Sequence, residues 1–282
     1  MLKINTNYPP NFRNKADGLN LLSSLTDESI KTAFFDPQYR GVLDKLAYGN
    51  EGVNRGKARC NLTQMDETTI KSFIQEINRV LSPSGHLFLW VDKFHLCQGV
   101  LQWLQHTDLN LVDMVVWNKC KIGMGFRTRR KSEYLIVCQK SPVRAKGKWT
   151  VHNIPDVWDE KTPKLHPHSK PLELQKALIE ATTQEGDWIL DPAAGGYSVL
   201  TACQELNRNF IGCDIEFGEE PHKTERCSAV KSRASSIFCC HIAVNSKTRT
   251  VKPLEIRGFQ RCRIIPTRLC RWALVLNHKV HG

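Results

Sequence analysis

The chain has 282 residues, a net charge of +12 and 11 cysteines. This length allows one large α/β domain, or one domain with a small appendage. Residues 1–7 lack the apolar core of a secretory signal, and no apolar run is long enough to cross a membrane. We therefore expect a cytoplasmic protein with reduced cysteines. The chain has no C-x-x-C pair, so we expect no metal site. This includes the potential ligands near the C-terminus, Cys239, Cys240, His241 and Cys262.

The positive charge is unevenly distributed along the chain. Residues 219–282 hold 13 Lys and Arg against four Asp and Glu, a net of +9, which leaves +3 for residues 1–218. A basic balance favours a phosphate-rich partner, but most of the excess lies outside the part with recognisable motifs. The sequence predicts a catalytic domain at 1–218 and a basic, Cys-rich tail at 219–282 without a clear helix or strand period.

Residues 1–218 alternate between predicted strands and predicted helices. The strands are short, apolar and mostly non-alternating, as strands buried on both faces should be: 31–35, 86–92, 111–117, 133–139, 187–190 and 210–215. One clear helix covers 66–81, with Asp66 as its N-cap, and a second covers 171–183, with Pro171 at its start. This alternation indicates an α/β fold with a parallel, doubly wound sheet.

The first predicted strand stops at Asp36-Pro37-Gln38-Tyr39. Open parallel sheets place their chemistry at such strand ends. The carboxylate of Asp36 and the backbone carbonyl of Pro37 form a pair of acceptors, one for each proton of an amino group. Such a pair would localise the nitrogen lone pair and make a poor nucleophile more reactive. Tyr39 adds a ring that can stack on a planar base.

A second polar loop, Asp191-Pro192-Ala193-Ala194-Gly195-Gly196, follows the strand at 187–190. Glycine at this position lets a ligand approach the backbone closely. Asp214 ends the next strand 23 residues beyond Asp191, where an acid binds ribose hydroxyls in Rossmann-like folds. The absence of G-x-G-x-x-G and G-K-[ST] patterns counts against NAD, FAD and ATP. The shorter loop suits S-adenosylmethionine, which has no pyrophosphate.

These two loops resemble the catalytic and cofactor motifs of the β class of amino-methylating (adenine-N6 or cytosine-N4) DNA methyltransferases, in which the catalytic motif comes first. The first loop is similar to the family's Asp-Pro-Pro-Tyr, with Gln38 in place of the second proline. The second is similar to Asp-Pro-Phe-Ala-Gly-Ser-Gly. The resemblance spans residues 14–217. It implies a Rossmann-like methyltransferase fold with a mostly parallel seven-stranded sheet, circularly permuted motif order and S-adenosylmethionine as cofactor.

Two further segments carry the resemblance. Residues 166–174 are similar to the family's His-Pro-Thr-Gln-Lys-Pro-Leu-Glu-Leu, and residues 16–22 to its Gly-Asp-Ala-Leu, with the glycine after Asp17 instead of before the acid. Lys170 would pair with the cofactor carboxylate or be solvated, and neither His166 nor His168 is expected to be catalytic. The implied cofactor contacts are Asp17, Lys170, Pro171, Asp191, Ala193, Ala194, Gly195 and Asp214, and the implied catalytic residues are Asp36, Pro37, Gln38 and Tyr39.

Basic segments are the candidates for binding double-stranded DNA, from which the target base must be flipped. We expect small recognition loops at 40–64 and 141–165, both long and polar. A third basic segment, 121–131, contains the expected DNA contacts Arg127, Arg129, Arg130 and Lys131. The resemblance leaves a homodimer and a cognate restriction endonuclease open as further partners.

Three alternatives to adenine-N6 methylation remain at this point. Cytosine-N4 methylation is the closest, although Asp36 favours adenine because cytosine-N4 relatives more often carry Ser at that position. A catalytically impaired DNA-binding remnant would explain Gln38 and the disorganised tail. Methylation of protein or RNA is disfavoured, because such relatives carry Asn-Pro-Pro-Tyr after the cofactor motif.

Overall fold

The computed structural model describes residues 7–38, 65–123, 127–163 and 169–220. All of these lie in the first of two compact units, Met1–Glu225. Several predicted features fall outside the described residues: Tyr39, the loop at 40–64, His166, His168 and all but the first two residues of the tail. Within the described part of the chain, no helix combines the length and the hydrophobicity needed to cross a bilayer.

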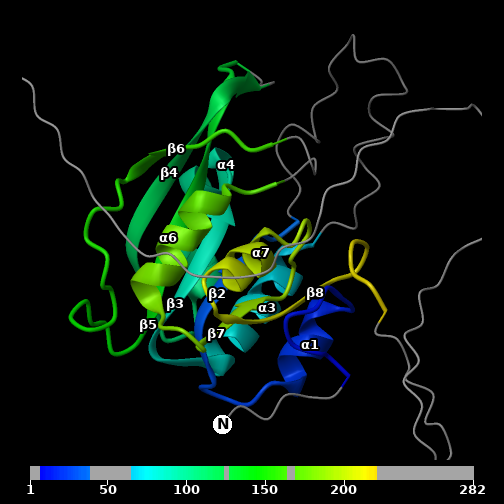
Figure 1. The fold of residues 1–282 in the computed structure, drawn as a ribbon. Coiled ribbons are helices and arrows are strands. Elements are labelled where there is room, and N and C mark those ends of the chain that lie inside the picture. The colour runs from blue at the N-terminus through cyan, green and yellow to red at the C-terminus, as the bar shows by residue number, and fades with distance from the viewer. Residues whose placement is uncertain (1–6, 39–64, 124–126, 164–168, 221–282) are drawn as a thin grey trace, which may run out of the picture. The chain divides into compact units, whose positions relative to one another are not determined.

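The described residues form an eight-stranded sheet with the order β1-β8-β7-β2-β3-β5-β4-β6 (Figure 1). Its strands are β1 (Asn14–Lys15), β2 (Ile30–Phe35), β3 (Leu81–Val91), β4 (Leu109–Gly123), β5 (Arg130–Lys140), β6 (Val157–Asp159), β7 (Trp188–Asp191) and β8 (Asn209–Asp214). Neighbouring strands are parallel except at β5, which is antiparallel to both β3 and β4. The mostly parallel α/β sheet is confirmed, and the two short edge strands β1 and β6 bring the strand number above the expected seven.

Six helices connect these strands in the described residues: α1 (Gly18–Ser24), α3 (Glu67–Val80), α4 (Lys93–Gln98), α5 (Leu101–Leu104), α6 (Leu172–Thr182) and α7 (Ser198–Glu205). The predicted cap of α3 is confirmed, since the Asp66 carboxylate accepts a hydrogen bond from the Thr69 amide at 2.7 Å. Helix α6 begins one residue later than predicted, because Pro171 is its N-cap.

Two hydrophobic cores lie on opposite faces of the sheet. One packs α1, α3 and α5 against strand residues such as Phe35, and the other packs α6 and α7 against residues such as Phe34 (Figure 1). Neighbouring side chains on β2 therefore enter different cores, as the twofold alternation of a strand requires. This explains why the predicted strands are apolar at nearly every position.

Strands β2, β3, β7 and β8 all end at the same edge of the sheet, here called the carboxyl edge. The β4–β5 hairpin extends beyond this edge, because Val91 at the end of β3 pairs with Tyr134, several residues after β5 begins. Strand β4 continues past the same level to Gly123. The hairpin therefore carries the basic segment 121–131 on the side of the sheet where the strand-end motifs lie.

The segment at 141–163 does not form a single loop at the carboxyl edge. Its first part lies at the opposite edge of the sheet. There the Ser84 hydroxyl donates a hydrogen bond to the Pro142 carbonyl at 2.6 Å. The Trp149 and His86 rings pack edge-on, with their centroids 5.7 Å apart. Burial, together with the charge of Lys148, lowers the pKa of His86 to about 4, so this imidazole is neutral. The chain reaches the carboxyl edge again only at β6.

Candidate active site

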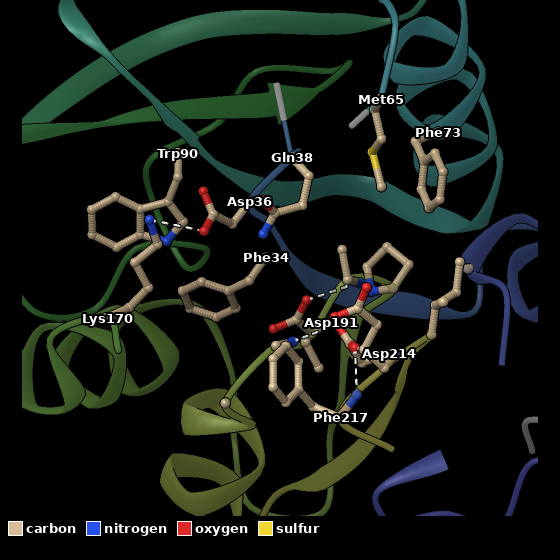
Figure 2. Close-up of a pocket in the computed structure, with 18 of the residues that line it drawn as sticks. Phe34, Asp36, Gln38, Met65, Phe73, Trp90, Lys170, Asp191, Asp214 and Phe217 are labelled. Carbon is tan, nitrogen blue, oxygen red and sulfur yellow. Dashed lines mark hydrogen bonds and ion pairs between the residues drawn. The ribbon is translucent and has the colours of Figure 1, made fainter. Parts of the chain in front are cut away.

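The carboxyl ends of β2, β7 and β8 open onto a cavity of about 270 Å³ (Figure 2). Nine of the residues predicted as catalytic or cofactor-binding line it: Asp17, Asp36, Gln38, Lys170, Asp191, Ala193, Ala194, Gly195 and Asp214. Pro37 and Pro171 are not among the residues that line the cavity, and Tyr39 lies outside the described residues. The structure thus brings together two motifs that are about 150 residues apart in the chain.

Asp214 joins two loops of the cavity wall. One carboxylate oxygen accepts a hydrogen bond from the Gly195 amide at 3.0 Å. The other accepts from the amides of Glu216 and Phe217, both at 2.8 Å. The acid is therefore held in place at the end of β8, beside the glycine loop that follows β7.

Asp17 enters the cavity from the start of α1, where its carboxylate caps the amides of Leu19 and Asn20 at 2.9 and 3.1 Å. The residue after it must be glycine. A Cβ at Gly18 would lie 2.3 Å from the carbonyl oxygen of Pro192, in the loop after β7. The glycine that follows the acid in this chain therefore has a packing role, because it brings α1 against the loop after β7.

Asp191 is buried at the floor of the cavity, and its carboxylate accepts a hydrogen bond from the Ala193 amide at 3.2 Å. Burial raises the pKa of Asp191 well above its usual range. The amide of Ala193 lowers this pKa, whereas the charges of Asp36 and Asp214 raise it further. Several carboxylates facing one cavity favour a positively charged ligand.

Apolar side chains also line the cavity: Met65 and Phe73 lie together on one side, and Phe217 lies beside Asp214 (Figure 2). Gln175 from α6 adds a buried side-chain carbonyl for which the described residues supply no hydrogen-bond partner. A site with acidic groups, an apolar wall and an unpaired acceptor fits S-adenosylmethionine. The carboxylates suit its sulfonium and ammonium charges, the apolar side chains suit its adenine, and the Gln175 carbonyl can accept from a ligand N–H or O–H.

Lys170 lies against the predicted catalytic acid (Figure 2). Its ammonium Nζ is 2.9 Å from Asp36 Oδ2 and 3.0 Å from Glu133 Oε2, and it stands 4.7 Å from the centre of the Trp90 ring. Sequence reasoning gave Lys170 a cofactor carboxylate or solvent as its partner. The structure instead gives it two protein carboxylates, one from the end of β2 and one from β5.

The four predicted DNA contacts divide into two groups. Arg127, Arg129 and Lys131 are exposed on the β4–β5 hairpin. Arg130 differs, because its guanidinium turns inward and lies 3.9 Å from the carboxylate of Asp92, the N-cap of α4. Arg130 thus pairs with a carboxylate of the protein, whereas its three neighbours are exposed, and its contact with DNA stays a prediction.

Sequence reasoning missed Trp90, Glu133 and Glu160. Glu160, at the end of the segment 141–163, accepts hydrogen bonds from the first-turn amides of Glu173 and Leu174 in α6, at 3.2 and 3.1 Å. It is an N-terminal cap supplied from a distant part of the chain. Only Glu133 left a signal in the sequence, as a single acid next to the basic run that ends at Lys131.

Comparisons with known proteins agree with this geometry. A DNA methylase family, covering N6 and N4 enzymes, matches residues 30–220. The type II methyltransferase M.HhaII of Haemophilus parahaemolyticus is 60% identical over 217 residues, which are 76% of this chain and 95% of that protein.

Two solved structures share the fold at low sequence identity. The PvuII DNA methyltransferase, named cytosine-N4-specific, has a TM-score of 0.58 and 15% identity, with 75% of this chain and 86% of that chain covered. The complex of M1.HpyAVI with S-adenosylmethionine has a TM-score of 0.53 and 17% identity, with 73% and 93% covered. Because both identities are low, these likenesses concern the fold alone.

Proposed function

Because the chain belongs to the N6/N4 DNA methylase family and is an S-adenosylmethionine-dependent DNA methyltransferase, we propose that it methylates the exocyclic N6 of adenine in a base flipped out of double-stranded DNA. The single observation that carries this proposal is the position of Asp36. Its carboxylate lies at the carboxyl end of β2, on the same cavity as the acids of the cofactor loops. Substrate and cofactor groups can therefore meet there.

The residues of this chain prepare the amine for attack. Asp36 and the carbonyl of Pro37 would each accept one amino hydrogen and hold the nitrogen lone pair toward the donor. Tyr39 would stack on the flipped base. When bound, S-adenosylmethionine would supply an electrophilic methyl group on its sulfonium. The amine held by Asp36 and Pro37 would accept this methyl group as the C–S bond breaks with its electron pair remaining on sulfur, and the surplus amine proton would pass to solvent.

Gln38 is compatible with this role. Its backbone carbonyl accepts a hydrogen bond from the Met65 amide at 2.8 Å, which ties the end of the tetrapeptide to the start of α3. This contact restrains the backbone at the position where the family's second proline would do so. It favours an active enzyme over the catalytically impaired alternative.

The choice of adenine over cytosine depends on the carboxylate of Asp36, and the fold is neutral on this point. Digestion of methylated DNA to nucleosides, followed by mass analysis, tests the proposal directly. We expect N6-methyladenine. N4-methylcytosine would contradict the adenine assignment and leave the methyltransferase activity standing.

The DNA-binding surface is proposed to be the outer part of the β4–β5 hairpin. Arg127, Arg129 and Lys131 are exposed there, beyond the carboxyl edge on which Asp36 lies. Each phosphate that these side chains neutralise would add to the salt dependence of binding. The first part of the segment at 141–163 lies at the other edge of the sheet, so the hairpin and β6 are the better candidates for contact near the target base.

We place this activity in a restriction–modification system in the cytoplasm, with a cognate endonuclease as its biological counterpart. A homodimer is also proposed. Sedimentation of the full chain with and without DNA tests the dimer, and a single monomeric species under both conditions would contradict it.

A further inference from the structure

We propose that Lys170 is the fixed counter-ion of the catalytic carboxylate of Asp36, and that Glu133 is a positioning residue which acts through Lys170. This inference rests on the proposed function, because it takes Asp36 as the acceptor of the amino hydrogens. It gives two residues a role in the reaction: Lys170, which the sequence assigned to the cofactor, and Glu133, which the sequence did not assign.

Residues from three strands converge on the Lys170 ammonium. Asp36 comes from the end of β2 and Glu133 from β5, at 2.9 and 3.0 Å from Nζ, while Trp90 from β3 covers it with a ring face at 4.7 Å. On the far side of Glu133, Lys119 from β4 forms a further ion pair with the other carboxylate oxygen. Glu133 is thus held between two lysines, and Lys170 between two carboxylates.

Both ends of the Lys170–Glu133 pair keep their charges. Burial lowers the pKa of Lys170, but the charges of Asp36 and Glu133 and their hydrogen bonds outweigh burial and raise it above its usual range. Burial raises the pKa of Glu133, but the charges of Lys170 and Lys119 outweigh it and hold the value at about 2. Lys170 therefore stays an ammonium and Glu133 a carboxylate across the physiological pH range.

This arrangement suits an acceptor that must not rotate or become protonated. A carboxylate with one oxygen fixed by a buried ammonium presents its acceptors in a set direction, and the nearby positive charge favours the ionised form. The negative charge of Asp36 helps to raise the pKa of Asp191 and the positive charge of Lys170 lowers it, so the three groups lie close enough to interact. Glu133 matters because Lys170 has a flexible stem, and a second carboxylate fixes where its ammonium lies.

The charge on Lys170 could also serve the cofactor, and the two roles make different predictions. A contact to the cofactor carboxylate would act on binding of S-adenosylmethionine. A counter-ion of Asp36 would act on the methyl-transfer step and leave cofactor affinity almost unchanged.

The test compares Lys170→Met and Glu133→Gln with wild type in the full chain. Three quantities are measured: calorimetric affinity for S-adenosylmethionine, the single-turnover methylation rate on DNA, and the dependence of that rate on pH. Lys176→Met is the matched control, because Lys176 lies on α6, pairs with Glu173 and Glu205, and is not among the residues that line the cavity.

We expect Lys170→Met to lower the single-turnover rate by about 100-fold or more. The pH below which the rate falls should move to a higher value. Affinity for S-adenosylmethionine should change by less than about threefold. Glu133→Gln should lower the single-turnover rate by about tenfold and leave the affinity for S-adenosylmethionine unchanged. Lys176→Met should match wild type in all three measurements.

Lys170→Met could also disturb folding, since it leaves two carboxylates without their shared partner. Lys170→Ala with added methylammonium covers this case, because recovery of the rate with amine concentration requires a folded site that lacks only the charge. Absence of rescue, together with a normal rate in Glu133→Gln, would overturn the proposal.

A fall in cofactor affinity of tenfold or more in Lys170→Met, with a normal rate at saturating cofactor, would also overturn the proposal and make Lys170 a cofactor contact. Asp36→Ala separates this failure from that of the proposed function. If Asp36→Ala is inactive while the Lys170 and Glu133 variants behave like wild type, only the present inference fails. If Asp36→Ala remains active, the assignment of Asp36 itself fails.

Discussion

The carboxylate of Asp214 accepts a hydrogen bond from the Gly195 amide at 3.0 Å, which joins the end of β8 to the glycine loop after β7. Its second oxygen holds the amides of Glu216 and Phe217. The acid predicted to bind the cofactor ribose therefore also shapes the wall of the cavity. Removing it should affect the contacts of the ligand and the loops that surround the ligand.

We expect Asp214→Ala to weaken the binding of S-adenosylmethionine by about 10- to 150-fold, since a hydrogen bond to a charged group is worth roughly 1.5–3 kcal/mol. Asp214→Asn should lose less, because its amide oxygen can still accept from Gly195. Calorimetric titration checks both, with the exposed Asp113→Ala as control. Wild-type affinity in Asp214→Ala would show that the ribose acid lies elsewhere.

Asp36→Ala should abolish methylation while cofactor affinity stays within a few-fold of wild type. The carboxylate is assigned to the substrate amine, so its loss should act on the chemical step. Single-turnover assays with tritiated S-adenosylmethionine measure the rate, and calorimetry measures binding. Turnover within a few-fold of wild type would remove Asp36 from the mechanism.

Much of the fold could be predicted because its signals are local. Asp66 begins α3 and the predicted strands form, since the caps and apolar runs that specify them lie within a few residues. The cavity could also be predicted, because parallel strands bring Asp36 and Asp191 to one edge whatever the details of their packing.

The direction of side chains and the pairing of distant strands could not be predicted from the sequence. Arg130 is one of four consecutive or near-consecutive basic residues, and only the register of β5 against β3 turns it toward Asp92. The pairing of Lys170 with Asp36 could not be predicted, because it also involves Glu133, which β5 brings beside Lys170. Residues 141–150 lie at the far edge of the sheet for the same reason, because β5 runs away from the site.

Asp191 should make cofactor binding depend on pH. Its pKa in the free protein is raised well above the usual range, and a cationic ligand favours the ionised form. Binding should therefore release a proton at pH values below the raised pKa, and affinity should rise with pH until that pKa is passed. Calorimetry in buffers of different ionisation enthalpy measures the released proton.

The same raised pKa has the opposite sign for the stability of the free protein. The folded state holds the proton of Asp191 at pH values where the unfolded chain has lost it, so stability should fall as pH rises above the unfolded pKa. Asp191→Asn should remove this fall and also lower cofactor affinity. A variant with the same pH dependence of unfolding as wild type would contradict the assignment.

Glu160 should stabilise the fold from a position outside the cavity lining. Its carboxylate caps two amides of α6 and accepts from the Trp158 indole at 2.8 Å. We expect Glu160→Ala to cost about 1–3 kcal/mol, or a fall in Tm of about 2–4 °C for each kcal/mol. Thermal unfolding measures it, and Glu180→Ala, exposed near the other end of α6, is the control.

The described sheet ends shortly before Glu220, where we expect that the chain can be shortened. Glu219 pairs with the region of β1: the Lys15 amide donates to its carbonyl at 3.0 Å, and its own amide donates to the carbonyl of Arg13. All eight strands of the described sheet precede this residue. Truncation after Glu220 should therefore leave a folded protein that binds S-adenosylmethionine with wild-type affinity.

Truncation after Glu216 is the matched control, because it removes the amide of Phe217 that Asp214 binds and the pairing of Glu219 with β1. It should lower both Tm and cofactor affinity. Residues 221–282, which the truncation after Glu220 removes, carry 13 Lys and Arg against two Glu, a net charge of +11. The chain that ends at Glu220 should therefore also lose DNA affinity at low salt more than at high salt. Insolubility of the chain that ends at Glu220 would show that residues beyond it belong to the catalytic fold.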